Sequence, residues 1–174
     1  MADGTDLPCA VEVRTTTLER CRTKPRVLSC RLEPARFSLP PGYTAPLTSP
    51  ERAALLARVL VGDLARESFL AIYLNAANCP ISYDAYTVGG VAAVNVDAGA
   101  IIQGAIMVGA PRLITAHNHP SGSTEPSEND LDVWMEISRR ARCVGIEHID
   151  DLIVTPDRFY SRHDDISRRY GGIP

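Results

Sequence analysis

The chain has almost no lysine, because Lys24 is the only lysine among 18 basic residues. The net charge is -3, which excludes a general electrostatic attraction for nucleic acid or for an anionic membrane surface. The N-terminal residues lack a positive charge followed by an apolar stretch, so we expect a cytoplasmic location. The apolar segment 88–111 contains Asn95, Asp97 and Gln103, and their cost in a bilayer argues against a membrane span.

Cysteine pairs and glycine-rich phosphate loops are also missing. The five cysteines show no C-x-x-C spacing, which predicts reduced thiols rather than a disulfide framework, with a pairing of Cys21 and Cys30 left open. Gly89 and Gly90 belong to no G-x-G-x-x-G or P-loop pattern. Nothing in the sequence therefore predicts a nucleotide-binding loop.

The chain does contain strand-like stretches that alternate with helix-like ones. Apolar runs predict strands at 67–76, 81–88, 93–96, 112–116 and 147–154. Start signals predict helices after Ser49, from Ala98 and after Ser127. The first and last of these helices have apolar stripes, at Leu55, Leu56, Val59 and Leu60 and at Leu131, Trp134, Ile137, Ala141 and Val144. This order predicts an α/β fold, a single domain with a central mixed sheet flanked by helices.

The first 48 residues differ in composition from the rest. Residues 10–14 and 26–32 alternate like the strands of a hairpin, and the segment from Arg14 to Arg36 carries seven basic and two acidic residues. The basic excess is typical of a solvated edge, with a binding patch for an acidic partner or nucleic acid as the alternative. We expect an N-terminal extension and linker at 1–48, the main domain at 49–163 and a charged tail at 164–174.

The stretch 117–130 has the outline of a metal site. Side chains alternate along a strand, so His117 and His119 project from one face at the end of the strand that begins at 112. Asp130 falls in the first turn of the helix that Ser127 caps. Two imidazoles and one carboxylate are a common ligand set of catalytic zinc and leave a fourth position for water. The alternative is that Ser127 and Asp130 form only a capping box, but the joint spacing H-x-H-x7-S-x2-D favours a site.

This spacing resembles the JAMM (MPN-plus) metal-hydrolase motif. Its His-Asn-His-Pro-Ser-Gly form is similar to the RadC branch of bacterial JAB-domain proteins, over roughly residues 49–162. The resemblance implies that His117, His119 and Asp130 bind one zinc ion and that Ser127 helps to stabilise an oxyanion. It also implies a glutamate at the start of an early strand as general base, and Glu67 matches that position.

Two positions depart from the pattern of that family. RadC-like chains usually have Pro-Arg-Glu before a helix, and here Gly99 stands in place of the arginine. They usually read Asp-His after the helix that follows the motif, and this chain has Asp150 and Asp151. Neither position is an implied ligand, so both changes bear on substrate contacts or ligand orientation. His148 and His163 are expected to be ordinary strand or surface residues.

The resemblance implies a zinc-dependent hydrolase of amide bonds, a metalloprotease or isopeptidase. Its substrate would be a peptide, a protein or a ubiquitin-like conjugate, and activity can require a partner. One alternative is a non-catalytic interaction module, and another is the DNA-repair-associated metal nuclease that the RadC label suggests, although no helix-hairpin-helix pattern precedes the domain. Zinc deamination of nucleobases needs H-x-E with P-C-x-x-C, which this chain lacks.

Overall fold

The computed structural model describes residues 10–15, 30–35, 43, 45–62, 65–87 and 96–165. The contacts within the chain divide it into two compact units, Met1–Ser38 and Leu39–Pro174. In the first unit, β1 (Ala10–Thr15) and β2 (Cys30–Ala35) pair as antiparallel strands with Val13 opposite Leu32. The expected hairpin-like pairing is therefore present. The predicted boundaries at residues 48 and 163 stay predictions.

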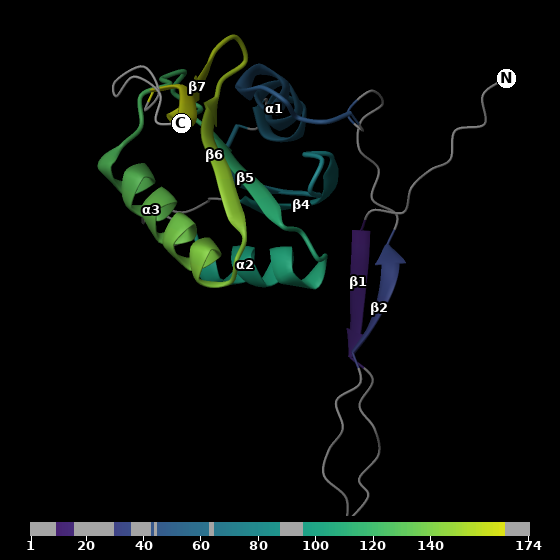
Figure 1. Cartoon of the computed structure of the whole chain (residues 1–174). Helices are drawn as coiled ribbons and strands as arrows, with labels where there is room; N and C mark the ends of the chain where they lie inside the picture. Colours follow the sequence, from purple (N-terminus) through teal and green to yellow (C-terminus); the bar gives the residue numbers. More distant parts are fainter. Residues whose placement is uncertain are drawn as a thin grey trace, which may run out of the picture. The chain divides into compact units, whose positions relative to one another are not determined.

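The second unit is built around one mixed five-stranded sheet (Figure 1). Its strand order is β4-β3-β5-β6-β7, and only the pair β5 and β6 is parallel. The central strands are apolar along most of their length because both faces of the sheet are covered. The bounds are β3 Ser68–Leu74, β4 Pro80–Thr87, β5 Arg112–Asn118, β6 Glu147–Val154 and β7 Phe159–Ser161.

Helices cover the two faces of this sheet. On one face, α1 (Pro50–Ala57) continues into a π-helical turn, Arg58–Gly62, and packs on the even-numbered residues of β3. On the other face lie α2 (Ala98–Met107) and α3 (Glu128–Cys143), packed on the odd-numbered residues of β3. The α/β fold with a mixed sheet flanked by helices is confirmed. Among the described residues, no helix is long and apolar enough to cross a membrane.

The predicted apolar stripes are partly wrong. Leu55 of α1 and Val59 of the π-helical turn are exposed, because α1 turns its alanines toward the sheet, where small side chains permit close packing. Leu131 of α3 and Val144, the residue that caps its C-terminus, are exposed, while Trp134, Ile137 and Ala141 are buried. Asp130 takes the buried position in the first turn. Leu131, the next residue, is rotated by about 100° around the helix and is therefore exposed.

The helix predicted from Ala98 packs closely on the sheet, as its small residues indicated. A Cβ atom at Gly104 would clash with the hydroxyl of Tyr73, which bonds to Asp84 at 2.7 Å. Only a glycine allows this approach of helix to strand. The strand expected at 93–96 falls mostly outside the described residues.

Candidate metal centre

The site lies where the end of β5 meets the start of α3. His117 belongs to β5 and His119 follows it, held by a bond from its backbone N–H to the carbonyl oxygen of Val154 at 3.3 Å. Asp130 lies in the first turn of α3. Glu67 comes directly before β3, the antiparallel neighbour of β5. Side chains from three separate parts of the sequence thus meet at one point.

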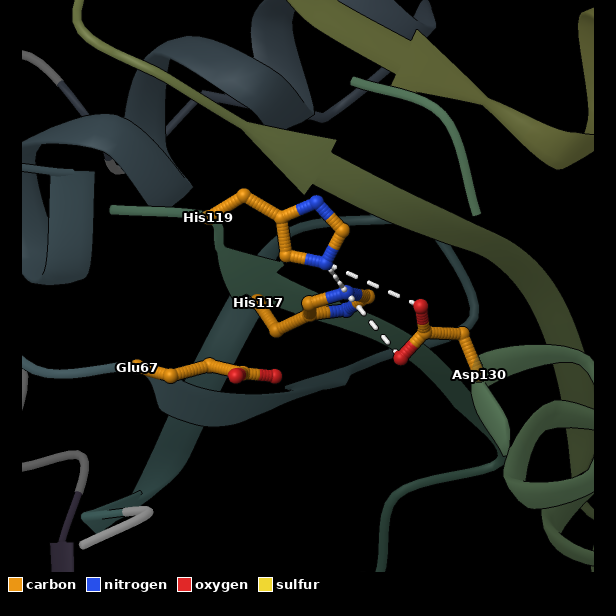
Figure 2. Close-up of side chains that lie close together, drawn as sticks. All are labelled: Glu67, His117, His119 and Asp130. Carbon is orange, nitrogen blue, oxygen red and sulfur yellow. Dashed lines mark hydrogen bonds and ion pairs between the residues drawn. The ribbon is translucent and has the colours of Figure 1, made fainter. Parts of the chain in front are cut away.

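Their polar atoms converge. One ligand atom from each of Glu67, His117, His119 and Asp130 lies within 4.8 Å of the others. The Nε2 atoms of the two histidines are 3.0 Å apart, and Asp130 lies 3.4 Å from His117 and 3.7 Å from His119. Figure 2 shows all four side chains directed toward the same space, with Glu67 below the imidazoles and Asp130 opposite them.

Packing and hydrogen bonds fix the two imidazoles. The His117 ring is 2% exposed and lies between Phe69 and Trp134, with centroids 6.1 Å and 6.0 Å away. Its Nδ1 atom is buried and has no hydrogen-bond partner in the described part of the chain. The Nδ1 atom of His119 pairs with the carbonyl oxygen of Ser123 at 3.0 Å, which directs Nε2 into the site.

Ser127 and Asp130 form a complete capping box, in which the side chain of each residue accepts a hydrogen bond from the backbone N–H of the other. The backbone N–H and the hydroxyl of Ser127 donate to Oδ2 of Asp130 at 2.7 Å and 2.6 Å, and the Oγ atom of Ser127 accepts from the backbone N–H of Asp130. These bonds hold Oδ2 and leave Oδ1 turned to His117. The single hydroxyl proton of Ser127 is committed to the carboxylate in this arrangement.

The charge state of the site favours a cation. Burial works to raise the pKa of the Asp130 carboxyl, but hydrogen bonds from His117, His119 and Ser127 outweigh it and hold this pKa well below its usual range. The hydrogen bond to Asp130 is the main reason that the pKa of His119 is raised, against the effect of burial. Asp130 is therefore ionised at neutral pH and supplies the negative charge that a divalent cation requires.

The donor set fits a zinc ion. Two imidazole nitrogens at this separation repel each other unless a proton or a cation lies between them. Ligand atoms bound tetrahedrally at 2.0–2.1 Å would be about 3.3 Å apart. The two Nε2 atoms are 3.0 Å apart, and the carboxylate of Asp130 approaches them with Oδ1 at 3.4 Å from His117 and Oδ2 at 3.7 Å from His119, which is close to that value. His117, His119 and Asp130 can hold the ion, and the predicted roles of these residues stay predictions.

A cavity of about 470 Å³ opens beside these residues. Glu67, His119 and Asp130 line its polar side, while Phe69, Val96 and Val133 line an apolar side. This volume is within the range of small-molecule and peptide side-chain sites. The point where the polar atoms converge is therefore accessible from the cavity.

Sequence reasoning missed a second group of polar residues under the same face of the sheet. His148 is buried, and its ring nitrogens lie 2.8 Å from Ser138 Oγ and 3.0 Å from Asp151 Oδ1. Asp151 also accepts from Thr115 and pairs with Arg162 at 3.1 Å. We name this group the buried polar cluster: Thr115, Ser138, His148, Asp151 and Arg162. His148 is thus a buried strand residue, whereas His163 is exposed.

The two departures from the family pattern have local explanations. Asp151 is satisfied inside the buried polar cluster. Gly99 lies in the first turn of α2, where its N–H donates to Asp97 at 2.8 Å. A side chain at this position would meet the Nη1 atom of Arg140 at 2.9 Å, so Arg140 from α3 fills the space beside it.

The site and fold define a class of protein, an α/β domain whose candidate metal ligands come from a strand end and a helix start. A family model described as the RadC-like JAB domain matches residues 47–167. The chain belongs to this family, and the resemblance seen in the sequence is confirmed.

Two relatives are about one third identical to this chain over the matched residues. A UPF0758 protein of Flavobacterium johnsoniae is 32% identical over 119 residues, which are 68% of this chain and 52% of that protein. One from Geobacillus sp. is 36% identical over 115 residues, 66% of this chain and 51% of its own length. The chain spans about half the length of these curated relatives, whose names state no activity.

Proposed function

We propose that this protein is a zinc-dependent hydrolase of amide bonds, a metalloprotease or isopeptidase. The observation that carries the proposal is the convergence of two imidazoles, a carboxylate and a separate glutamate beside an open cavity. Three ligands leave a position for water, and the fourth acid is available for proton transfer. Membership of the RadC-like JAB domain family supports the same chemistry.

Each residue has a defined task in this proposal. His117, His119 and Asp130 would hold the zinc ion, which when bound supplies an acidified water and a positive charge beside the substrate carbonyl. Glu67 takes a proton from the attacking water and delivers it to the leaving nitrogen. Ser127 keeps the Asp130 carboxylate oriented, and its predicted role as an oxyanion donor requires its hydroxyl to release Oδ2.

The cavity supports a peptide-like substrate. Phe69, Val96 and Val133 provide an apolar surface next to Glu67, which suits an aliphatic group beside the scissile amide. A peptide, a protein or a ubiquitin-like conjugate offers such a group, and we propose this substrate class. A cytoplasmic location remains the sequence-based prediction.

The test is the substitution Glu67→Gln in zinc-loaded protein. The variant keeps the shape of the side chain but cannot accept the proton, so we expect unchanged zinc content and amide hydrolysis slowed by about 100-fold to 10,000-fold. Turnover would be followed with a fluorogenic peptide library and a ubiquitin-like isopeptide substrate. Hydrolysis at the wild-type rate by zinc-loaded Glu67→Gln contradicts the assignment. Full zinc occupancy with no amide hydrolysis by the wild type favours the interaction module instead.

A further inference from the structure

We propose that Asn118, the residue between the two histidines, is a positioning residue that fixes Glu67 relative to the metal ligands. The inference rests on the proposed role of Glu67 as general base. Asn118 is 1% exposed and projects to the face of the sheet opposite His117 and His119. It therefore contributes nothing directly to the converging ligand atoms.

The Asn118 side chain binds the two peptide groups on either side of Glu67. Its Oδ1 atom accepts a hydrogen bond from the backbone N–H of Ser68 at 2.7 Å. Its Nδ2 atom donates to the backbone carbonyl oxygen of Arg66 at 3.2 Å. One planar amide thus clamps the chain directly before and directly after the proposed base.

The position of these bonds in the sheet explains why a side chain is needed. The ladder between β3 and β5 ends at the pair Phe69 and His117. Ser68 and Asn118 are next in line, and here the side-chain amide takes over the pairing, because it offers the same donor and acceptor as a peptide group. Asn118 thereby extends the connection between the strands as far as Glu67, which lies outside β3.

The proposed metal ligands have other connections besides this one. His117 pairs with Ile153 of β6, and His119 bonds to Val154. Asp130 is held by Ser127. Loss of the Asn118 amide should therefore displace the base and leave the ligands in place. Because a displacement of about 1 Å at a reacting group can cost about 100-fold in rate, the expected effect is on turnover.

The experiment compares Asn118→Ala and Asn118→Asp with a matched control, Asn75→Ala. Asn75 lies at the other end of β3, where its Oδ1 atom accepts from the N–H groups of Ala77 and Cys79, both at 2.9 Å. We expect Asn118→Ala to lower kcat by about 100-fold with zinc content and KM unchanged. Asn118→Asp keeps the acceptor for Ser68 and loses the donor to Arg66, so its loss should be smaller. Asn75→Ala should keep the wild-type kcat.

A double-mutant cycle separates positioning of the base from a general structural role. In the Glu67→Gln background, Asn118→Ala should cause no further loss, because no base is left to misplace. An equal loss in both backgrounds overturns the proposal, as does loss of zinc from Asn118→Ala or a wild-type kcat in that variant. If Asn118→Ala does not fold, the same cycle is run with Asn118→Asp.

A readout without catalysis distinguishes failure of this inference from failure of the proposed function. The Ser68 amide proton is protected by Asn118, so its hydrogen exchange in metal-free protein should be faster in Asn118→Ala than in wild type or Asn75→Ala. Unchanged exchange at Ser68 overturns the clamp even if the protein is an amide hydrolase. Faster exchange at Ser68 in Asn118→Ala, together with a wild-type protein that hydrolyses no amide, supports the clamp and removes the proposed function.

Discussion

Two clusters of histidine and aspartate lie on the α3 side of the same sheet, and they differ in what their ring nitrogens face. In the buried polar cluster, both nitrogens of His148 have protein partners, and Asp151 is shared among a histidine, a threonine and an arginine. In the metal site, the Nε2 atoms of His117 and His119 face each other and a carboxylate beside a cavity.

The comparison shows that residue types alone do not define a metal site. The buried polar cluster contains a histidine and an aspartate 3.0 Å apart, yet its donors and acceptors satisfy one another and join α3, β5 and β6. The candidate metal site brings two imidazole nitrogens and a carboxylate together beside a cavity. A divalent cation can bind the lone pairs of all three groups at once, which a single proton cannot do.

The largest expected effect is a loss of stability in Asp151→Ala, which removes the central acceptor of the buried polar cluster. The substitution leaves His148, Thr115 and Arg162 without their shared acceptor, and each buried donor left without a partner costs about 1–3 kcal/mol. Urea unfolding of metal-free protein measures the loss. Glu136→Ala is the control, because it breaks exposed ion pairs with Arg139 and Arg140 and should change the unfolding midpoint little. Equal losses in both variants would contradict the role of the cluster.

A smaller effect is expected from Ser127→Ala, which removes one hydrogen bond from the ligand carboxylate. If Ser127 orients Asp130, zinc affinity falls by about 10-fold to 100-fold, in line with losses of groups that orient ligands. The loss of the helix cap adds about 1 kcal/mol of destabilisation. Competition with a fluorescent chelator gives the affinity, and Ser127→Thr, which keeps the hydroxyl, should restore most of it. Wild-type affinity with a lowered kcat would instead support the oxyanion role alone.

The smallest expected effect is a pH dependence of the unfolding free energy that comes from Asp150, whose side chain lies on the opposite face of the sheet from Asp151. Burial raises the pKa of its carboxyl above 3.8, against hydrogen bonds from Ser161, His163 and Asp151. Because the pKa of Asp150 is higher in the folded state than in the unfolded state, its contribution to stability is fully present below about pH 4. This contribution is lost as the pH rises through the pKa of the folded state. The unfolding free energy of Asp150→Asn relative to wild type should therefore increase between pH 4 and pH 7. A difference independent of pH would contradict this.

Much of the fold and the convergence of the candidate metal ligands could be predicted from local patterns. The alternation of side chains along a strand places His117 and His119 together, and the S-x-x-D signature places Asp130 at the start of a helix. The identification of Glu67 needed the family resemblance, because it reaches the site through the pairing of β3 with β5. Nothing in the local sequence around Glu67 marks it as functional.

The buried polar cluster was not predictable in this way. His148 and Asp151 are three residues apart, which on a regular strand would put them on opposite faces. A register shift between β5 and β6, at Leu113 and Ile114, lets both side chains reach the α3 face. Tertiary pairing of this kind leaves no local signal. The role of Asn118 was missed for a similar reason, since its partners lie 50 and 52 residues away.

The most direct test of the central claim is the zinc content of three purified proteins, measured by elemental analysis after equilibration with zinc. We compare wild type with Asp130→Asn and with Asp151→Asn, the same change of charge in the buried polar cluster. The account predicts one zinc ion per chain in wild type and in Asp151→Asn, and almost none in Asp130→Asn. Zinc retained by Asp130→Asn, or lost from a folded Asp151→Asn, would contradict it.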